Sequence, residues 1–340
     1  MSQSEHVWAL ILAAGEGSRL RDLTSNASGA AVPKQYCTLL GGPTLLENTI
    51  RRAGRFALPG NISVIVAEQH RAWWQRDLQS VPAANIVVQP RNRGSGNGVL
   101  LQLLQVAHRD PQALVVLLPS DQFVAEESVL ARSIQAALAQ VRACPEQIVL
   151  LGMRPAYADS QLGYIIASDT DADATPQPPD TGALPVAEFI EKPVLPLARQ
   201  LIARGALWNA FILAASAAAL LRVYAQQLPG IMGAMRQALA DEQDPARELA
   251  ALYERLPTVD FSRDLLCDSH VLPLRVLPVP LCGWSDLGTP ECVARVLAHM
   301  PDMQQAPQRR REPGVPVNLA SNFYRAVQTR CPVAPAALHQ

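Results

Sequence analysis

Short apolar runs alternate with helical segments along most of this chain, and that alternation limits which folds it can adopt. Each run is short and bounded by polar or turn residues, which favours a β-strand. The predicted strands are Trp8–Ala13, Ile62–Ala67, Ile86–Gln89, Leu114–Leu118, Ile148–Met153, Val186–Glu191, Trp208–Leu213 and Leu274–Val279. The predicted helices are Thr44–Phe56, Gly96–His108, Ser128–Val141, Pro196–Ala203 and Ala215–Ala225. This pattern predicts an α/β fold with a doubly wound, mostly parallel, Rossmann-like sheet.

The first predicted strand runs into a glycine-rich turn, Gly15-Glu-Gly-Ser-Arg19, and Pro33-Lys34-Gln35 follows shortly afterwards. Gly15 and Gly17 let the backbone approach a ligand, and successive N–H groups there can bind an anion. Arg19 and Lys34 would add positive charge. Ligands of such sheets bind beyond the carboxyl ends of the strands, where this turn lies. The segment therefore predicts a polyphosphate site.

Two common phosphate loops are excluded by the residues that follow the glycines. A Walker A loop ends in Gly-Lys-Ser/Thr, whereas this turn ends in Ser18-Arg19-Leu20. A dinucleotide-binding turn needs a third glycine, and Leu20 occupies that place. A solvated glycine turn is the remaining alternative, and Pro33-Lys34-Gln35 shifts the balance towards phosphate binding.

The segment Leu10–Arg19, together with Pro33-Lys34-Gln35-Tyr36, resembles the nucleotide-binding signature of sugar-1-phosphate nucleotidyltransferases. Within that family it is most similar to the mannose-1-phosphate guanylyltransferases. The resemblance covers roughly Trp8 to Arg295 and implies a sheet of the nucleotidyltransferase or GT-A type. The nucleotide-binding residues that it implies are Leu12, Ala13, Ala14, Gly15, Gly17, Ser18, Arg19, Lys34, Gln89, Asn92, Arg93 and Gly94.

Two distant segments supply carboxylates. Asp121 follows a buried strand, and Asp286 lies in Gly283-Trp-Ser-Asp-Leu-Gly288, which matches the family's Trp-Ser-Asp-aliphatic-Gly segment. The resemblance implies that both bind Mg²⁺, the cofactor, because carboxylates commonly hold magnesium beside phosphates. The alternative is that each aspartate only caps a helix or turn. Gln122 stands where the family usually has histidine.

The segment Val186–Pro193 fits the family's Phe-x-Glu-Lys-Pro pattern. The resemblance implies that Lys192 neutralises the phosphate of the sugar 1-phosphate and that Glu191 accepts hydrogen bonds from sugar hydroxyls. A solvated Glu-Lys pair is the alternative. Gly163 and Asn209 complete the implied sugar-phosphate site. The implied catalytic residues are Arg19, Lys34, Asp121, Lys192 and Asp286.

Two loops differ from the guanylyltransferase pattern. The base-reading loop has Asn92-Arg-Gly-Ser-Gly96 in place of Arg-Asn-Thr-Ala-Pro. In the sugar loop, Ala210 and Phe211 follow Asn209 where the family has Ser-Gly.

The predicted domain organisation is a catalytic domain over residues 1–299 and a tail over 300–340. In the tail, Pro, Gln and Arg are dense and helical periodicity fades, so an extended or partly disordered segment is expected. Asn322–Val327 can form a short helix there.

The predicted function is Mg²⁺-dependent transfer of a nucleotidyl group from a nucleoside triphosphate to a sugar 1-phosphate. The resemblance implies that the nucleoside triphosphate is GTP and that the sugar 1-phosphate is mannose 1-phosphate. One alternative is a GT-A-type glycosyltransferase that uses Asp169-Thr-Asp-Ala-Asp173 as its metal site. Another is an inactive nucleotide-sugar-binding regulator.

Charge and composition narrow the partners. Twenty-nine Lys and Arg residues nearly balance 30 Asp and Glu residues, and the one cationic run is Arg309–Arg311, so nucleic-acid binding is not expected. The apolar stretch Ala206–Leu221 is short for a membrane span and contains Asn209. Scattered cysteines and a polar N-terminus indicate a cytoplasmic protein. Among protein partners, a second copy of the chain, forming a homodimer, is the one to be tested.

Overall fold

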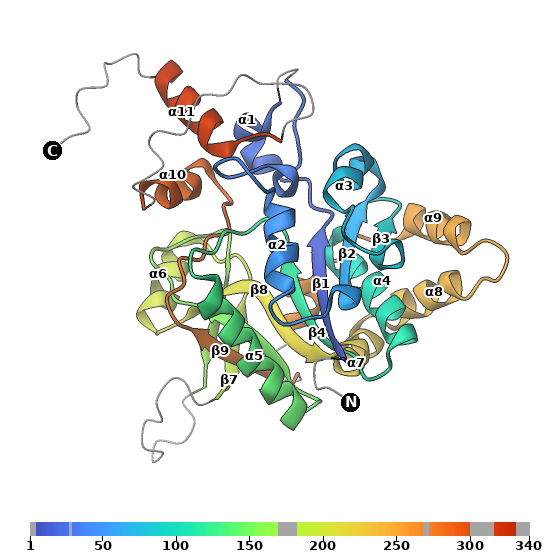
Figure 1. Ribbon diagram of the computed structural model, residues 1–340. Coiled ribbons are helices and arrows are strands. Elements are labelled where there is room, and N and C mark those ends of the chain that lie inside the picture. Colours follow the sequence, from blue (N-terminus) through green and yellow to red (C-terminus); the bar gives the residue numbers. More distant parts are fainter. Residues whose placement is uncertain (1–4, 27–28, 169–181, 268–271, 300–315, 331–340) are drawn as a thin grey trace.

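A computed structural model of the chain describes residues 5–26, 29–168, 182–267, 272–299 and 316–330, with only the backbone for residues 18 and 325–330. These residues form a nine-stranded sheet of order β3-β2-β1-β4-β8-β5-β9-β7-β6 (Figure 1). Its strands are β1 (Val7–Ala13), β2 (Ile62–Ala67), β3 (Ile86–Gln89), β4 (Leu114–Pro119), β5 (Ile148–Met153), β6 (Gly163–Ala167), β7 (Leu184–Ile190), β8 (Leu207–Ser216) and β9 (Leu274–Val279).

The sheet is mixed. Parallel pairing joins β3, β2, β1 and β4 in one half and β5 with β9 in the other. Strand β8 is antiparallel to its neighbours β4 and β5, and β7 is antiparallel to β9 and β6. The predicted α/β class is confirmed, but the Rossmann-like parallel order does not extend through the second half. Apolar runs reveal that a segment is a buried strand, whereas its direction depends on connections made in the tertiary structure.

Helices cover both faces of the sheet. The α-helices are α1 (Arg21–Thr24), α2 (Leu45–Ala53), α3 (Arg71–Asp77), α4 (Gly94–Arg109), α5 (Glu127–Ala143), α6 (Leu195–Ala203), α7 (Ala217–Gln227), α8 (Pro229–Leu239), α9 (Pro245–Arg255), α10 (Pro290–Ala298) and α11 (Leu319–Arg330). Alternate residues of β1 point to opposite faces: Val7, Ala9 and Ile11 belong to the core shared with α2 and α5, whereas Trp8 and Leu10 belong to the core shared with α4 and α7.

Every strand and helix expected from the sequence is present, with ends shifted by a few residues. The structure adds β6 and the helices α1, α3, α8, α9 and α10, none of which the pattern revealed. Pro229, Pro245 and Pro290 each open one of these helices. Proline is tolerated at the first helical position because its missing N–H would have no intrahelical partner there. A proline in these three segments therefore marks a helix start.

Part of the predicted tail is ordered against the rest of the chain. The short helix expected at Asn322–Val327 is present within the longer α11, which contacts α1 and α10. In this part of the chain the expectation of an extended segment is wrong. Residues 300–315 and 331–340, together with Asp169–Asp173 of the glycosyltransferase alternative, lie outside the described residues.

The apolar stretch Ala206–Leu221 forms β8 followed directly by α7. Among the described helices, none combines the length and apolar character that a membrane crossing requires. The five cysteines in the described ranges all carry free thiols.

Candidate active site

The glycine-rich turn after β1 is held in place by Gln35 and Tyr36. The Gln35 side-chain amide donates to the carbonyls of Ala13 and Gly15, each at 2.9 Å, and the Tyr36 hydroxyl donates to Ala13 O at 3.1 Å. Both side chains are buried. The Pro-Lys-Gln segment thus fixes the shape of the turn as well as contributing a lysine, a role that the sequence did not reveal.

The two glycines of the turn differ in what requires them. Gly17 has a φ of +59°, and a Cβ there would lie 3.0 Å from Lys34 Cβ, so both conformation and crowding favour glycine. Gly15 has an ordinary φ, and no atom lies within 4 Å of the place of a Cβ. Since the described residues leave this space open, a ligand could approach the backbone at Gly15.

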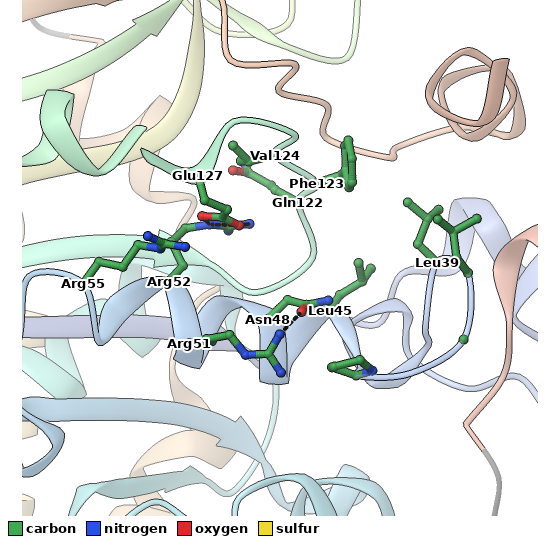
Figure 2. Close-up of a pocket in the computed structure, with 13 residues that line it drawn as sticks. Leu39, Leu45, Asn48, Arg51, Arg52, Arg55, Gln122, Phe123, Val124 and Glu127 are labelled. Carbon is green, nitrogen blue, oxygen red and sulfur yellow. Dashed lines mark hydrogen bonds and ion pairs between the residues drawn. The ribbon is translucent and has the colours of Figure 1, made fainter. Parts of the chain in front are cut away.

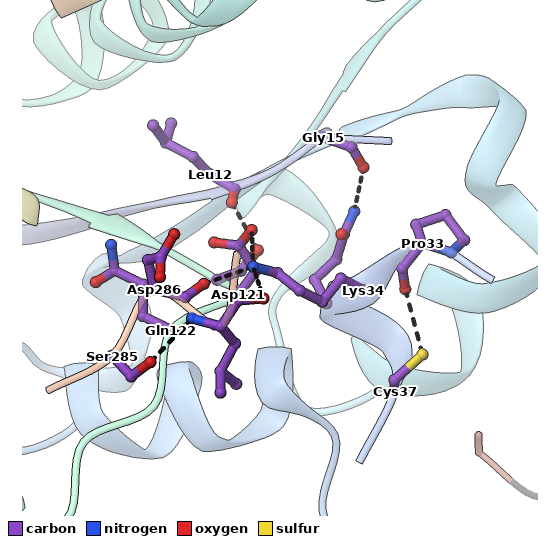
Figure 3. Close-up of polar contacts among 12 residues, drawn as sticks. Leu12, Gly15, Pro33, Lys34, Cys37, Asp121, Gln122, Ser285 and Asp286 are labelled. Carbon is purple, nitrogen blue, oxygen red and sulfur yellow. Dashed lines mark hydrogen bonds and ion pairs between the residues drawn. The ribbon is translucent and has the colours of Figure 1, made fainter. Parts of the chain in front are cut away.

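Lys34 is buried beside both predicted metal ligands. Its Nζ lies 3.0 Å from Asp121 Oδ2, and it donates to the carbonyls of Asp286 at 2.6 Å and Leu287 at 3.3 Å (Figure 3). The Lys34 side chain is 5% exposed, whereas that of Asp121 is 39% exposed. The lysine therefore joins the loop after β4 to the loop before α10.

Backbone and side-chain hydrogen bonds fasten these two acidic loops together. Phe123 and Ser285 exchange two backbone hydrogen bonds of 2.9 Å. The Trp284 indole donates to Gln122 Oε1 at 2.9 Å, and Gln122 Nε2 donates to Ala210 O at 2.7 Å. Gln122, the departure from the family pattern, thus ties the Asp121 loop to both the Asp286 loop and β8.

Arg19 reaches the same place from the glycine-rich turn. A Cβ on Gly288 would lie 2.1 Å from Asp286 Oδ2 and 3.4 Å from an Arg19 guanidinium nitrogen. The lack of a side chain at Gly288 is therefore what leaves room for the Asp286 carboxylate. Arg19, Lys34, Asp121 and Asp286, which the sequence predicted to act together, do converge at the carboxyl ends of β1 and β4.

A second group of predicted residues surrounds Glu191. A Cβ on Gly163 would lie 2.5 Å from Glu191 Oε2 and 3.3 Å from Asn209 Cβ, so these residues are neighbours. The Lys192 Nζ lies 3.2 Å from Glu191 Oε1, and the Lys192 side chain is 49% exposed. Glu191 Oε2 is buried without a hydrogen-bond partner among the described residues.

The Glu191 carboxyl group is buried and has few polar partners. Burial raises the pKa of the Glu191 carboxyl above its ordinary value, and the nearby Lys192 ammonium only partly offsets this. A hydroxyl donor would satisfy the orphaned Oε2 atom and stabilise the charged form. Glu191 therefore keeps an unused acceptor atom, and its role towards a sugar hydroxyl stays a prediction.

Backbone strain is concentrated in the loops that carry predicted site residues. Among the described residues, the non-glycine residues with positive φ are Lys192 at 48°, Phe211 at 57° and Leu287 at 47°. Each is a predicted site residue or follows one closely. Such conformations cost about 1–3 kcal/mol and often mark functional sites. Phe211 occupies the place where the family has glycine, and its ring packs edge-on against Phe261, 5.7 Å between centroids.

The Phe261 segment adjoins the predicted sugar-phosphate site, although no motif in the sequence indicated it. It precedes a short π-helix, Ser262–Leu266, and Ser262 Oγ accepts a hydrogen bond of 3.3 Å from Asn209 Nδ2. Asp260 and Arg263 lie close enough to influence the charge of Glu191. The charged residues on both sides of Phe261 were the available signal, and isolated turns of π-helix are frequent at functional sites.

The predicted base-reading loop is engaged largely with the protein itself. Arg93 donates to the carbonyls of Tyr253 at 2.7 Å and Glu254 at 2.8 Å, and Asn92 Oδ1 accepts from Gly94 N at 3.0 Å. A Cβ on Gly94 would lie 2.2 Å from Val259 O. The changed glycines therefore let the start of α4 pack against the segment that contains Val259.

Gln89 is buried at the end of β3, and its Oε1 atom has no hydrogen-bond partner among the described residues. A Cβ on Gly98 would lie 3.4 Å from this atom, so the Gln89 side chain packs against α4, while the Arg93 guanidinium has two nitrogens engaged.

A cavity of about 300 Å³ lies between α2 and the segment 122–127, which follows Asp121 in the chain (Figure 2). Its walls come from α2, the segment after Cys37 and residues 122–127. Arg52, with a side chain 2% exposed, forms a two-pronged ion pair with Glu127 at one side. This ion pair joins α2 to the start of α5. It therefore helps to hold in place the segment between Asp121 and α5.

Comparison with known proteins agrees with this arrangement. Residues 8–302 match the family described as Nucleotidyl transferase. The chain is 28% identical over 303 residues to mannose-1-phosphate guanylyltransferase ManC of Salmonella typhimurium, covering 87% of this chain and 60% of ManC. It is 29% identical over 288 residues to alginate biosynthesis protein AlgA of Pseudomonas aeruginosa, covering 82% of this chain and 56% of AlgA. The chain thus spans about three fifths of the length of these relatives.

Among solved structures, a Thermus thermophilus protein described as mannose-1-phosphate geranyltransferase has a TM-score of 0.72 at 23% identity, covering 86% of this chain and 79% of that one. At this identity the likeness concerns the fold. The family match, in contrast, extends over most of the sequence, and its residues include the whole converging group from Arg19 to Asp286. The chain therefore belongs to the nucleotidyl transferase family.

Proposed function

We propose that the protein transfers a guanylyl group from GTP to mannose 1-phosphate, giving GDP-mannose and pyrophosphate. The observation that carries this proposal is the contact of Lys34 with both acidic loops at the end of β1. It brings two cations and two carboxylates, from distant parts of the sequence, to the glycine-rich turn. The names of relatives such as ManC support the choice of base and sugar.

The proposed reaction needs no covalent intermediate and no strong base. An oxygen of the sugar phosphate, already anionic, forms a bond to the α-phosphorus of the triphosphate, and the bond from that phosphorus to the oxygen bridging to the β-phosphate breaks. Catalysis then rests on positioning and on neutralising charge. Arg19 would hold the triphosphate, and Lys192 would hold the phosphate of the acceptor. Lys34, whose ammonium group is engaged by Asp121 and two carbonyls, would add positive charge to the site and hold the two acidic loops together.

Asp121 and Asp286 fit a magnesium site. Both offer hard oxygen donors at a partly exposed position, and the described residues contain no cluster of three or more metal-binding side chains. Magnesium is commonly held by one or two carboxylates, with phosphates and water as its other ligands. When bound, the ion would supply electrostatic stabilisation of the negative charge that builds up around the α-phosphate.

The acceptor site is proposed to lie at Gly163, Glu191, Lys192 and Asn209. Glu191 would accept a hydrogen bond from a sugar hydroxyl through its unpartnered Oε2 atom. Asn209 Nδ2 is only 3.3 Å from Ser262 Oγ, so the Ser262 segment would help to set the shape of the sugar site.

A pyrophosphate-release matrix tests the proposal. Four nucleoside triphosphates are paired with the 1-phosphates of mannose, glucose, fucose and N-acetylglucosamine, with Mg²⁺ present. The expected result is the highest kcat/KM for GTP with mannose 1-phosphate. A different preferred pair would correct the substrates. Sugar release from a nucleotide sugar, or nucleotide binding without pyrophosphate release for every pair, would favour the glycosyltransferase or the inactive regulator instead.

A further inference from the structure

The C-terminal segment Val317–Tyr324 contacts two places in the chain, one shortly after Arg19 and one shortly after Lys34. In Figure 1, α11 lies beside α1 and α10, far from the N-terminal end of β1. Its leading residues add a short parallel bridge to Thr38: Thr38 N donates to Val317 O at 2.8 Å, and Leu319 N donates to Thr38 O at 2.8 Å. Ala320 N also donates to Leu39 O at 3.0 Å. These contacts fix the chain shortly after Lys34.

Asn322 makes the second attachment. Its Nδ2 donates to Leu23 O at 2.6 Å and to Ser25 O at 3.3 Å, and the residue is only 8% exposed. Carbonyls at the end of a helix have no intrahelical donor, so they need partners from elsewhere. Here an amide from the far end of the chain supplies one to the short helix α1.

Each attachment lies a few residues after one of the predicted phosphate-binding cations, Leu23 and Ser25 after Arg19, and Thr38 after Lys34. Arg19 lies in the turn of 3₁₀-helix Ser18–Leu20, which runs directly into α1. Lys34 opens a second 3₁₀-helix, and Cys37 N donates to Lys34 O at 2.9 Å. Val32 N, in turn, donates to Thr24 O at 3.0 Å, which joins the end of α1 to the segment that leads to Lys34. A displacement of α1 would therefore be passed to Arg19.

Ordinary core packing explains only part of this arrangement. Leu319 and Ala320 are fully buried and belong to the same core as Leu20, Leu23 and Tyr36. A helix that merely covered apolar surface would need no buried amide. The polar contact of Asn322 with the end of α1 specifies the position of that helix, because a hydrogen bond of this kind is directional.

We propose that Asn322 is a positioning residue for the triphosphate site, acting through α1 on Arg19. This inference rests on the proposed function, since it assigns the triphosphate to the turn that contains Arg19. It predicts an effect on the nucleotide and not on the sugar phosphate, because Glu191 and Lys192 belong to other strands and loops.

The test uses Asn322→Asp and Asn322→Ala in the full chain. Aspartate has the same shape but, when ionised, cannot donate to the carbonyls of Leu23 and Ser25. KM for GTP, KM for mannose 1-phosphate, kcat and the melting temperature are measured, with assays well below every melting temperature. Tyr324→Ala is the matched control, because Tyr324 is an exposed residue of the same helix.

The expected result is a rise of about tenfold or more in KM for GTP in both Asn322 variants, the scale of about 1.4 kcal/mol in binding. KM for mannose 1-phosphate should change less than twofold, and the control should resemble the wild type. Equal changes in both KM values, an unchanged KM for GTP, or a loss of kcat that follows the melting temperature alone would overturn the proposal.

The failure of the proposed function gives a different result. In that case the wild type releases no pyrophosphate with any substrate pair, and calorimetric titration with GTP replaces the kinetic assay. Weaker binding in the Asn322 variants than in Tyr324→Ala would still support the positioning role, and equal binding would refute it.

Discussion

The ammonium group of Lys34 lies 3.0 Å from the carboxylate of Asp121, and only the aspartate is substantially exposed. Taking a lysine out of water is costly unless its charge is paired and its donors are used. Asp121 and the carbonyls of Asp286 and Leu287 meet that need in this structure. The two predicted metal ligands therefore differ in what they do for the fold.

This difference leads to a first prediction. Asp121→Ala and Asp286→Ala should each lower kcat by about 10²-fold or more, the scale of losing an electrostatic stabiliser of the transition state. Asp121→Ala should also lower the free energy of unfolding by about 1–3 kcal/mol, because it leaves the Lys34 charge poorly balanced, with partial exposure reducing the loss. Asp286→Ala should leave stability close to wild type, since its backbone carbonyl still accepts from Lys34.

Pyrophosphate release and urea unfolding would check this contrast. Glu126→Gln, an exposed carboxylate close to Asp121 in the chain, serves as the control and should change neither quantity. Wild-type turnover in Asp286→Ala would remove that residue from the proposed mechanism.

Gly288 gives the second prediction. Gly288→Ala would put a Cβ 2.1 Å from Asp286 Oδ2, so the carboxylate must move away from its present position. We expect a loss of kcat by about 10-fold or more, the scale of about 1.4 kcal/mol of lost transition-state stabilisation. Gly233→Ala, in α8, meets no atom within 4 Å and is the matched control. Normal turnover of Gly288→Ala would show that the position of Asp286 does not matter.

Gly15 gives the third prediction. In contrast to Gly288, it has open space at the place of a Cβ. Because the structure leaves open space at the place of its Cβ and its φ is ordinary, Gly15→Ala should fold with unchanged or slightly higher stability. KM for the nucleotide should nevertheless rise several-fold, since a methyl group would stand where a phosphate approaches the backbone. Thermal melting and nucleotide titration measure the two effects separately. An unchanged KM would place the triphosphate elsewhere.

The pH dependence of stability gives the fourth prediction. Burial raises the pKa of Glu191 in the folded protein above its ordinary value of 4.5. Between these two pKa values the folded state binds more protons than the unfolded state, so stability falls as pH rises through this range. Glu191→Gln removes this penalty, and it should be more stable than the wild type at neutral pH and lose that advantage in acid.

Urea unfolding at several pH values would test this, and KM for the sugar phosphate, expected to rise in the same variant, would test the binding role. Glu188→Gln is the matched control, because Glu188 lies on the adjoining strand β7 and is paired with the exposed Arg204. It should not gain stability at neutral pH. A Glu191→Gln variant less stable than the wild type at neutral pH would contradict the prediction.

Residue patterns predicted the elements that depend on local order. Most of the eight apolar runs are strands that bury side chains on both faces, and the glycine-rich turn begins where β1 ends. Pro33-Lys34-Gln35 and Gly283–Gly288 could be recognised because their residue types stand in a fixed order. These features need no knowledge of what lies across the molecule.

Other features depend on contacts between distant residues. In the sequence, Gln122 is a residue that differs from the family's usual histidine. In the structure, its side chain joins Trp284 to Ala210. Arg93 was predicted to contact the base, yet its guanidinium donates hydrogen bonds to carbonyls at the end of α9. In both cases the side chain's partners come from elements far away in sequence, and no local pattern encodes them.

The sequence by itself determined the α/β class, the strand-and-turn units and the identities of the charged residues, because periodicity and motif order are local properties. The tertiary structure alone decided the antiparallel insertion of β8, the junction of the Asp121 and Asp286 loops, and the seating of α11 against α1. Each of these depends on burial and hydrogen bonding between segments that meet only when the whole chain has folded.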